Sequence, residues 1–567
     1  MNTEKKEQIQ IVSLKDMLNK TRDIYKDDFA YKIKEDGNYR EISHVEVRDM
    51  IDSLGTALIT LGLDGKRIGV IGENRYEWEI SYLAVACGVG TIVPLDKSLP
   101  ENELKRLIER SEIEAIVFSN KYEEVLKKLV LEGTGKLKHL ISMDSKTHAG
   151  GIYSFSELIE IGKIQLNNGN REYLDAEINP EEMNIMLFTS GTTSEAKVVA
   201  LSHKNICSNL MAISEVLYID NTDRFLSFLP LHHVFECTAG FLFALYRGAR
   251  ISFCDGIRNM QENYKEYDIT FAACVPAIFE NMYRGLWKKL EKEGKKEAIE
   301  ALVEKYKDES DEVKKEVFKF VHDFFGGKMR KLVSGAAAID KSVVEGFRNF
   351  GMPIYQGYGL TETSPVVAVE GENSKKAGPI GKVIPNHMVK IDNPNEEGIG
   401  ELLVKGPSVM IGYYDNEAAT KEAIVDGWFH TGDLATIDEE GYIFIKGRMK
   451  SVIVLKNGKN IFPEEMENLV NRIEGVKESF IFGKSNKKDP DDIKIYVKVV
   501  YDREIMKIAY KTEDEEKIHE IISDKVKEIN NIMPMYKSIR GVVLSETPLI
   551  KTTTNKIKRQ EEIKTVI

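Results

Sequence analysis

The sequence predicts an α/β fold, in which a large N-terminal lobe of layered, mostly parallel sheets precedes a small α+β domain. From about residue 67 to residue 118, apolar runs such as RIGVIGEN and TIVPLD alternate with helical patterns such as EWEISYLAVACGVG. This alternation is typical of parallel strands joined by helices. Similar apolar strands recur at DRFLSFLPL, ARISFCD, DITFAACVP and MRKLVSGAA. Beyond residue 450, helical and strand patterns mix over a stretch long enough for a separate small domain.

Chain length and charge restrict the class of protein. The chain has 567 residues, which is too long for one core, so two to four lobes are expected. Charged residues make up 30% and aromatic residues 9% of the chain, as in ordinary globular proteins. The net charge of −12 argues against nucleic acid as the main partner, because such binding needs a clustered basic surface.

The sequence contains no pattern of secretion or membrane insertion. The first residues, MNTEKKEQIQIVSLKDML, lack the apolar core of a signal peptide. The apolar stretch at 239–246 is far shorter than the roughly 20 residues that cross a bilayer. Five widely spaced cysteines without a CxxC pair predict reduced, buried thiols and neither zinc nor disulfides. A cytoplasmic protein is therefore expected.

Two stretches break the α/β pattern. Residues 281–328 are rich in lysine and glutamate, with apolar residues at helical spacing. They predict a pair of solvent-facing amphipathic helices, with a membrane-surface role as the alternative. After Gly400, ELLVKGPSVMIGYYD and GYIFIKGRMKSVIVLKNG consist of short strands bounded by glycine. These predict hairpins that close the large lobe as a small β-barrel-like part.

The stretch LFTSGTTSEAKVVALSH, residues 187–203, places small and hydroxylated residues between two apolar strands. Small residues allow backbone amides to approach an anion, and hydroxyl groups add donors. The stretch therefore predicts a phosphate cradle without the Walker A spacing, and a Ser/Thr-rich hairpin turn is the alternative. The candidate side chains are Thr189, Ser190, Thr192, Thr193 and the cation Lys197.

Two further motifs suit a nucleotide. In QGYGLTE, Tyr358 could stack on a base, while Thr361 and Glu362 offer a phosphate donor and a hard oxygen ligand for Mg²⁺. In DGWFHTGD and the following GRMKSVIV, Asp433 and Arg448 could hold the two hydroxyls of a ribose. Taken alone, a GxG turn is commonplace, and a surface position or a turn cap is the favoured explanation of either charged residue.

The C-terminal stretch PLIKTTTNKIKRQ is basic, and by itself it would be read as a solvated charge run. In order along the chain, however, FTSGTTSEAKVVALSH, SGAAAID, QGYGLTET, DGWFHTGD, GRMKSVIVLKNGKNIFPEEME and TTTNKIKR resemble the core motifs of the adenylate-forming superfamily. This superfamily includes acyl-CoA synthetases, luciferase and peptide-synthetase adenylation domains. Within it, GVIGENRYEWEISYLA, LPLHHVFECTAGFL and the charged insertion resemble the long-chain fatty acid CoA ligase branch.

The resemblance implies an ATP site in which Thr189 and Glu362 hold Mg²⁺, Tyr358 lies against adenine and Thr361 contacts the α-phosphate. The residues that it assigns to ATP or AMP are Thr189, Ser190, Gly191, Thr192, Thr193, Ser194, Lys197, Gly335, Ala336, Ala337, Gln356, Gly357, Tyr358, Gly359, Thr361, Asp433 and Arg448.

The resemblance also implies a mobile C-terminal domain, residues 448–567, joined to the large domain, residues 1–447, by a hinge at Lys450. Lys556 would reach the reacting carboxylate and α-phosphate, where a placed cation contributes several kcal/mol. Rotation about the hinge would replace Lys556 by the loop 455–461, with Gly458 against the pantetheine arm of CoA. His233 matches a position near the acyl carboxylate, and a core histidine is the alternative.

Two departures from the family pattern affect these expectations. In the phosphate loop, Ser194, Ala196 and Val198 stand where the family has glycine, proline and glycine, so conformational freedom is lost there. In the tail, Asn555 replaces a glycine, a mild change because asparagine tolerates positive φ. Weaker ATP affinity or a slower rate is expected from the first change.

The resulting expectation is an AMP-forming ligase that activates a long-chain fatty acid with ATP and Mg²⁺ and transfers it to coenzyme A. Acylation of a carrier-protein phosphopantetheine, activation of an aryl acid, and a degenerate relative with little turnover are the alternatives. Acyl chain length and oligomeric state stay open, with at most peripheral membrane contact expected. The helix that could line a hydrocarbon tunnel, or form ordinary core, contains Phe235, Ala239, Gly240, Phe241, Leu242 and Phe243.

Overall fold

The computed structural model describes residues 8–566 apart from 36, 190–196, 373, 375, 377, 457–458, 487–488 and 553–555, and for 486 and 489–492 the backbone alone. The chain divides into two compact units. The first unit comprises Met1–Thr189, Lys197–Met388 and Val404–Phe429, and the second comprises Ser190–Ala196, Val389–Leu403 and His430–Ile567. The boundary expected at 447/448 lies inside the second unit and stays a prediction about which residues move.

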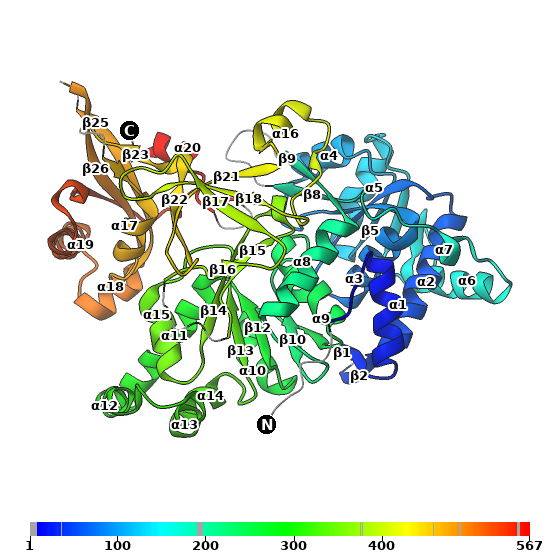
Figure 1. Ribbon diagram of the computed structural model, residues 1–567, viewed down its shortest axis with the longest axis horizontal. Helices are drawn as coiled ribbons and strands as arrows, with labels where there is room; N and C mark the ends of the chain where they lie inside the picture. The colour runs from blue at the N-terminus through cyan, green and yellow to red at the C-terminus, as the bar shows by residue number, and fades with distance from the viewer. Residues whose placement is uncertain are drawn as a thin grey trace. The chain divides into compact units, whose positions relative to one another are not determined.

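An eight-stranded sheet forms one layer of the first unit (Figure 1). In spatial order its strands are β19 (Gly412–Tyr413), β9 (Lys197–Ser202), β8 (Met183–Thr189), β4 (Gly90–Pro94), β3 (Lys66–Ile71), β5 (Ala115–Phe118), β6 (His139–Ser142) and β7 (Ile152–Ser154). The strands from β8 to β7 pair in parallel, as expected, whereas β9 is antiparallel to both of its neighbours. The GYYD strand was expected in a hairpin after Gly400, but β19 pairs with β9 instead.

A nine-stranded sheet forms the second layer, and its inner strands are parallel. In spatial order its strands are β16 (Lys382–Val383), β15 (Val366–Val369), β14 (Ile354–Gly359), β13 (Lys331–Ser334), β12 (Phe271–Cys274), β10 (Arg224–Ser227), β11 (Arg250–Phe253), β1 (Phe29–Glu35) and β2 (Asn38–Ser43). The four recurring apolar runs of the sequence are therefore confirmed as the centre of one sheet.

Helices cover both sheets. They are α1 (Leu14–Tyr25), α2 (His44–Thr60), α3 (Tyr76–Ala84), η1 (Val85–Val89), α4 (Glu101–Arg110), η2 (Asn120–Tyr122), α5 (Glu123–Leu131), α6 (Phe155–Asn167), α7 (Glu172–Asp175), α8 (His203–Val216), η3 (Phe235–Leu242), α9 (Phe243–Tyr246), η4 (Ile257–Asn259), α10 (Met260–Glu266), α15 (Lys341–Asn349), η5 (Thr361–Thr363) and α16 (Glu417–Ala423). Capping boxes at Ser43 and Ser202 start α2 and α8 because each serine and its third following residue satisfy end N–H groups reciprocally.

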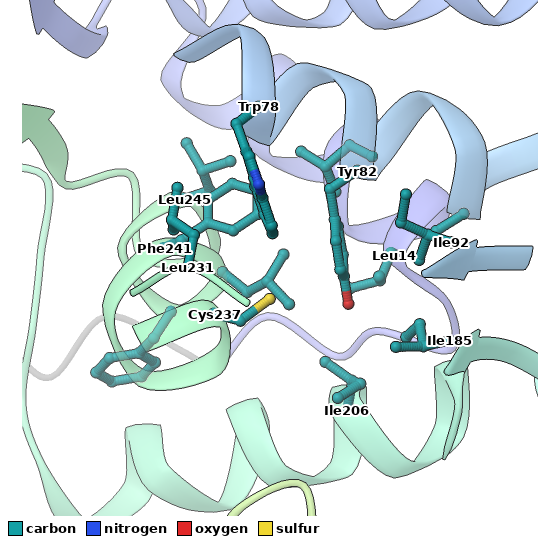
Figure 2. Packing of buried hydrophobic residues seen from close by; sticks show 14 of the residues in the cluster. Leu14, Trp78, Tyr82, Ile92, Ile185, Ile206, Leu231, Cys237, Phe241 and Leu245 are labelled. Carbon is teal, nitrogen blue, oxygen red and sulfur yellow. The ribbon is translucent and has the colours of Figure 1, made fainter. Parts of the chain in front are cut away.

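The main core of the first unit lies where α3 meets the helices η3 and α9. Trp78 and Tyr82 stack on one another with ring centroids 5.7 Å apart, and Phe241 meets Tyr82 edge-on. Figure 2 shows these rings around Cys237, with aliphatic side chains such as Leu245 beside them. The helix 235–243 is thus part of the core, and its residues Phe241 to Phe243 are at most 1% exposed.

The charged insertion forms more helices than expected, and they are not simply solvent-facing. Four helices occupy the region, α11 (Pro276–Lys292), α12 (Lys296–Tyr306), α13 (Asp311–Val317) and α14 (Lys319–Phe324). Their apolar faces join a second core with β12, β13 and α15, where Leu286, Phe318 and Phe325 are buried. Glycine and serine between the lysine-rich runs allow the extra turns, which the helical periodicity alone did not resolve.

In a further sheet, β17 (Met388–Asp392), β18 (Gly400–Lys405), β21 (Trp428–Ile437) and β22 (Ile443–Arg448) follow one another. Most of this sheet belongs to the second unit, which takes Val389–Leu403 and the chain from His430 onward. Strand β20 (Ile424–Val425) forms a short hairpin with Trp428 and Phe429 at the start of β21, and these residues belong to the first unit. A 3₁₀ turn, η6 (Met449–Ser451), leads to the hairpin of β23 (Ile453–Val454) and β24 (Asn460–Ile461). The predicted hairpins of this region are confirmed except for β19.

The C-terminal part has the expected α+β make-up. Its sheet has the order β25 (Val476–Asn486), β26 (Asp489–Tyr501), β27 (Ile539–Ser545), with α17 (Pro463–Val470), α18 (Arg503–Tyr510), α19 (Glu515–Ile532), η7 (Met535–Lys537), α20 (Arg559–Glu562) and η8 (Ile563–Thr565). Two details differ: α18 was not predicted, and the strands extend through most of the expected charged turn KSNKKDPDD. The core contains Met466, Ile481, Val497, Ile518 and Ile522.

Two further expectations were tested. In the part of the chain that the structure describes, no helix is both long and apolar enough to cross a membrane. All five cysteines are free thiols, and Cys87, Cys207, Cys237 and Cys274 are buried. The expectation of a fully buried set is wrong for Cys254, which is half-buried because it follows the end of β11.

Candidate functional site

Thr189 and Lys197 face each other where two strands enter the phosphate motif. Thr189 ends β8 and Lys197 begins β9, and the two residues are partners in the antiparallel register. The Thr189 hydroxyl donates to the Lys197 carbonyl at 3.4 Å. The residues between them, Ser190, Gly191, Thr192, Thr193, Ser194, Glu195 and Ala196, lie outside the described residues. The strand–loop–strand arrangement of the motif is confirmed at both of its ends.

The departure at Val198 lies in a strand and not in the loop. Val198 pairs with Phe188 across β8 and β9 and is fully buried in a core cluster. A strand position of this kind favours a β-branched side chain and does not need the freedom of glycine. The prediction that Val198 costs the phosphate loop conformational freedom is therefore wrong.

Tyr413 connects Lys197 to Glu362. The Lys197 ammonium lies over the Tyr413 ring, 4.4 Å from its centroid, a distance at which a cation is attracted to the ring face. The Tyr413 hydroxyl donates to Glu362 Oε1 at 2.9 Å. The Met410 N–H donates to the Glu362 carbonyl at 2.8 Å, which fixes the backbone there. A cation and a carboxylate predicted from separate motifs therefore meet at one aromatic residue.

This arrangement fits a magnesium ion that is bound together with phosphate. Mg²⁺ usually takes one or two protein oxygens and completes its shell with water and phosphate. Glu362 and Thr189 supply a carboxylate and a hydroxyl of that kind, and Glu362 is half-buried. Among the described residues, no three His, Cys, Asp or Glu side chains gather as a site held by the protein alone. The donor set thus suits Mg²⁺ shared with a nucleotide.

The segments proposed to surround a base lie at the ends of neighbouring strands. Ser334 of β13 pairs with Gln356 of β14, so residues 335–337 follow β13 beside Tyr358 on β14. Ala336 has a φ of 70°, which turns the backbone sharply just after the strand. In a largely parallel sheet, ligands bind outside the carboxyl ends of the strands. Gly335, Ala336, Ala337 and Tyr358 all occupy that edge.

The segment 356–359 is a strand and not the tight turn that its glycines suggested. Gly359 must be glycine, because a Cβ there would lie 2.0 Å from the Pro365 carbonyl oxygen. Gln356 is buried, and its N–H donates to Glu370 Oε2 at 2.8 Å. Burial raises the pKa of Glu370 to about 7. Gly357 and Tyr358 pair with Val369 and Ala368 of β15, so a ladder with the buried strand β15 holds this strand. Thr361 follows it at the start of η5.

His233 lies at the entrance to η3 and is half-buried, so it is not a fully enclosed core histidine. Its Nδ1 accepts from the Phe235 N–H at 3.3 Å. The Phe235 ring then reaches Gly335, where a Cβ would lie 2.9 Å from Cζ. Glu236, next in the helix, is 3% exposed and accepts from the Ser227 hydroxyl at 2.7 Å. Burial raises the pKa of Glu236 to about 8.

In the second unit, Asp433 and Arg448, which were predicted to hold a ribose, form an ion pair with each other. They are register partners on β21 and β22, and Arg448 Nε lies 2.8 Å from Asp433 Oδ1. Asp433 is buried, which argues against the surface position that was the alternative, whereas Arg448 is exposed, as that alternative had it. Glu401 supports this strand, because it accepts from the Gly432 N–H at 2.9 Å and contacts His430 Nδ1 at 2.8 Å. Lys450 lies two residues beyond Arg448 and is exposed.

Lys556 is also in the second unit and is exposed on the tail. Its carbonyl accepts from the Thr552 N–H at 2.8 Å, and Lys551 and Ile557 form an antiparallel bridge, so the chain on the two sides of residues 553–555 is paired. Gly458 and Asn555 lie outside the described residues.

The structure therefore gathers the predicted residues into three groups. Within the first unit, one group joins Thr189, Lys197 and Glu362 and another joins 335–337 with 356–359. Within the second unit, Asp433 pairs with Arg448. Sequence reasoning missed Tyr413, Glu370 and Glu401 as supporting residues. The doubled tyrosine in IGYYD was a signal for the first, while no local pattern marks the other two.

A model of the AMP-binding enzyme family matches residues 20–414. The chain belongs to the AMP-binding enzyme family. The predicted membership of the adenylate-forming superfamily, in its long-chain branch, is confirmed by this match and by curated relatives.

Those relatives have long-chain substrates in their names. Long-chain-fatty-acid–CoA ligase 1 of Homo sapiens is 30% identical over 495 residues, which cover 80% of this chain and 69% of that protein. Long-chain-fatty-acid–CoA ligase FadD15 of Mycobacterium tuberculosis is 27% identical over 79% of this chain and 76% of its own. Long chain acyl-CoA synthetase 3 of Arabidopsis thaliana is 28% identical over 79% and 72%.

Solved structures share the fold over almost the whole chain. The anthranilate CoA ligase bound to anthranoyl-AMP superposes with a TM-score of 0.77 at 19% identity, covering 98% of this chain and 97% of its own. ATP-bound MatB from Rhodopseudomonas palustris gives 0.75 at 22% identity, covering 98% and 99%. The Mycobacterium tuberculosis fatty acyl CoA synthetase gives 0.66 at 19%, covering 98% of both chains. At these identities the likeness confirms the predicted fold class.

Proposed function

We propose that the protein is an AMP-forming long-chain fatty acid CoA ligase. It activates a fatty carboxylate with ATP as an acyl adenylate, releases pyrophosphate, and passes the acyl group to the thiol of coenzyme A. The observation that carries the proposal is the meeting of Lys197 and Glu362 on Tyr413, at the open ends of the strands that flank the phosphate motif. The long-chain relatives support the choice of acid.

In the first step, the chain's task is to position two anions and neutralise the charge that develops between them. Thr189, Lys197 and residues 190–194 would hold the phosphates, and Thr361 would contact the α-phosphate. Mg²⁺, held by Glu362 and Thr189, would supply charge neutralisation at the phosphate oxygens. Tyr358 and residues 335–337 would hold the adenine. The strand edges described above support this division of roles.

Lys556 would neutralise the charge between the carboxylate and the α-phosphate, and His233 would lie near the carboxylate. In the second step the CoA thiol attacks the acyl carbonyl, and AMP leaves with its ribose held by Asp433 and Arg448. Lys556 and the CoA loop cannot occupy one face together, so residues 448–567 would rotate about Lys450 between steps. Gly458 would then lie against the pantetheine arm.

The test is a product assay with the purified chain. With ATP, Mg²⁺ and CoA, acids from C12 to C18 should release AMP and pyrophosphate in equal amounts and yield acyl-CoA. Benzoate and anthranilate serve as matched aryl controls, since solved relatives of the same fold include an anthranilate ligase. Absence of pyrophosphate release with every aliphatic acid would overturn the proposal.

Two alternatives are settled by the same assay. Replacing CoA by a holo carrier protein separates carrier acylation from CoA ligation, since only the acceptor changes. Binding of ATP without turnover would indicate the degenerate relative that Ser194 and Ala196 suggest. Val198 does not add to this suggestion, because it lies in a strand and is buried there. We further propose that the ligase works in the cytoplasm with at most peripheral membrane contact.

A further inference from the structure

The tail that carries Lys556 is a closed turn with defined backbone contacts. Lys551 and Ile557 form an antiparallel bridge. The Lys558 N–H donates to the Ile550 carbonyl at 2.8 Å, and the Lys556 N–H donates to the Thr552 hydroxyl at 3.1 Å. The two arms of the turn therefore meet at its base, and the orientation of Lys556 depends on how that base is anchored.

Arg559 and Glu467 anchor one arm. Arg559 Nη1 donates to Glu467 Oε1 at 2.9 Å, and Nη2 donates to Oε2 at 2.5 Å, which is a bidentate pair. Glu467 lies in α17 and is 6% exposed, and its Oε1 also accepts from the Ile481 N–H at 2.8 Å. The Arg559 guanidinium lies 5.5 Å from the Phe480 ring centroid and 3.2 Å from Glu464 Oε1.

Glu478 and Glu562 anchor the other arm through backbone N–H groups. The Leu549 N–H donates to Glu478 Oε1 at 2.8 Å, and the Ile550 N–H donates to Glu562 Oε2 at 2.7 Å. Glu562 is fully buried and also accepts from Lys498 Nζ at 2.5 Å. Carboxylates from α17, β25 and α20 thus hold both arms of one short turn.

We propose that Arg559 and Glu467 are positioning residues for Lys556. The inference rests on the proposed function, in which Lys556 acts in adenylate formation. Arg559 lies three residues after Lys556, and its planar fork fixes both distance and direction relative to α17, which a single-point ammonium contact does not do. A buried, bidentate pair at the base of the turn therefore determines where the lysine is presented.

Because the Arg559–Glu467 pair is buried, neither partner can be lost without a cost. Burial alone would lower the pKa of Arg559, but the Glu467 and Glu464 carboxylates raise it above its ordinary value, so the guanidinium is charged. Loss of either partner would leave an uncompensated buried charge. Displacing a catalytic group by about 1 Å can slow a reaction about 100-fold. The pair should consequently affect the step that uses Lys556 and spare the step that does not.

The experiment measures the two half-reactions of a double variant, Arg559→Met with Glu467→Gln. Both members of the buried pair are neutral in it, and the glutamine can still accept from the Ile481 N–H. Glu464 loses its contact with Arg559, but this carboxylate is only half-buried. Acyl-AMP formation is followed as pyrophosphate release, and thioester formation is started from purified acyl-AMP and CoA. The matched control is Glu465→Gln, on the same helix α17, whose carboxylate contacts Lys537 at 2.7 Å and not the tail.

We expect acyl-AMP formation by the double variant to fall about 10- to 100-fold in kcat. The KM for ATP and the thioester rate should stay within about twofold of the unmodified protein, as should both rates of the control. Arg559→Lys, which keeps the charge and loses the fork, should be intermediate. If the double variant does not fold, the ratio of the acyl-AMP rate to the thioester rate of Arg559→Lys tests the proposal in its place.

Two results would overturn the inference. One is an acyl-AMP rate of the double variant, or of Arg559→Lys, within twofold of the unmodified protein. The other is an equal loss in both half-reactions, which would indicate a general structural role. Absence of acyl-AMP formation by the unmodified protein is a separate outcome: it overturns the proposed function and, with it, this inference.

Discussion

Lys197 and Lys556, which are both proposed to meet phosphate, are held in different ways. Lys197 belongs to β9, where its backbone pairs with Thr189 of β8, and β19 pairs with the other edge of the strand. Lys556 lies on a turn closed by a single bridge, and side-chain carboxylates anchor that turn. A β-sheet ladder supports the first lysine, and buried ion pairs support the second.

The difference indicates where each site tolerates change. A ladder is made by main-chain groups, so neighbouring side chains can vary while the backbone keeps its register. A turn anchored by buried carboxylates depends on those side chains, because each one satisfies specific donors. A cation fixed within a sheet suits binding, while one on a separately anchored turn suits a group that must leave between two steps.

The largest effects are expected from removing the lysines themselves. Lys556→Ala should lower the rate of acyl-AMP formation about 100- to 1000-fold, because a placed charge in such a site is worth several kcal/mol. Its thioester half-reaction should be unchanged. Lys197→Ala should lower the same rate to a similar extent and also raise the KM for ATP about tenfold. Pyrophosphate release and acyl-CoA formation from acyl-AMP measure the two steps.

The exposed Lys421 of α16, which pairs with Glu417 at 2.7 Å, provides the control. Lys421→Ala should leave both half-reactions unchanged. An unaltered acyl-AMP rate in Lys556→Ala would reject the role assigned to that lysine. Loss of the thioester step in Lys556→Ala would contradict the separation of the two steps, while leaving the role of Lys197 intact.

Much of the fold could be predicted because its signals are local. Apolar runs separated by helical patterns are sufficient to predict the parallel strands, as at β3, β4 and β5. The partner of β19 could not be predicted, since a two-residue strand carries no information on which distant edge it joins. Only two of the four insertion helices were predicted. The four helices share a core with α15, and a tertiary contact of this kind leaves no local pattern in the sequence.

The candidate site shows the same limit. Motifs name Lys197 and Glu362 separately, but only the paired strands β9 and β19 place Tyr413 between them. Likewise, Arg559 reads as one more charge in a basic tail, and Glu467 as one acid in a helix. Their pairing spans 92 residues of chain, and no periodicity or spacing predicts such a contact.

A second prediction compares two buried carboxyl groups. Arg559 neutralises Glu467, whereas Glu236 of the first unit is held by the Ser227 hydroxyl, and burial raises its pKa to about 8. The folded state then keeps a proton that the unfolded state, with an ordinary pKa near 4.5, loses. The contribution of Glu236 to the free energy of unfolding is therefore fully present below pH 4.5. It is lost as the pH rises toward 8, by an amount on the order of 4 kcal/mol.

Glu236→Gln should remove that dependence, because glutamine keeps an acceptor for Ser227 and does not titrate. At pH 8 the variant should unfold at higher urea than the unmodified protein, and at pH 5 the two should match. Trp78, Trp287 and Trp428 are the only tryptophans and all belong to the first unit, so fluorescence reports its unfolding. Glu300→Gln, at an exposed site of α12, is the control. An equal difference at both pH values would contradict the prediction.

The smallest effect is expected at the side chain that supports Lys197. Tyr413→Phe keeps the ring face 4.4 Å below the ammonium and removes the 2.9 Å hydrogen bond to Glu362. Water can replace that donor on a half-buried carboxylate, so the loss should be about 1 kcal/mol, or roughly fivefold in the acyl-AMP rate. The concentration of Mg²⁺ needed for half-maximal rate should rise with it. Because a ladder and not this side chain holds Lys197, the effect of Tyr413→Phe should be smaller than that of altering Arg559 and Glu467. A larger effect of Tyr413→Phe would mean that side chains, and not the sheet, position both lysines.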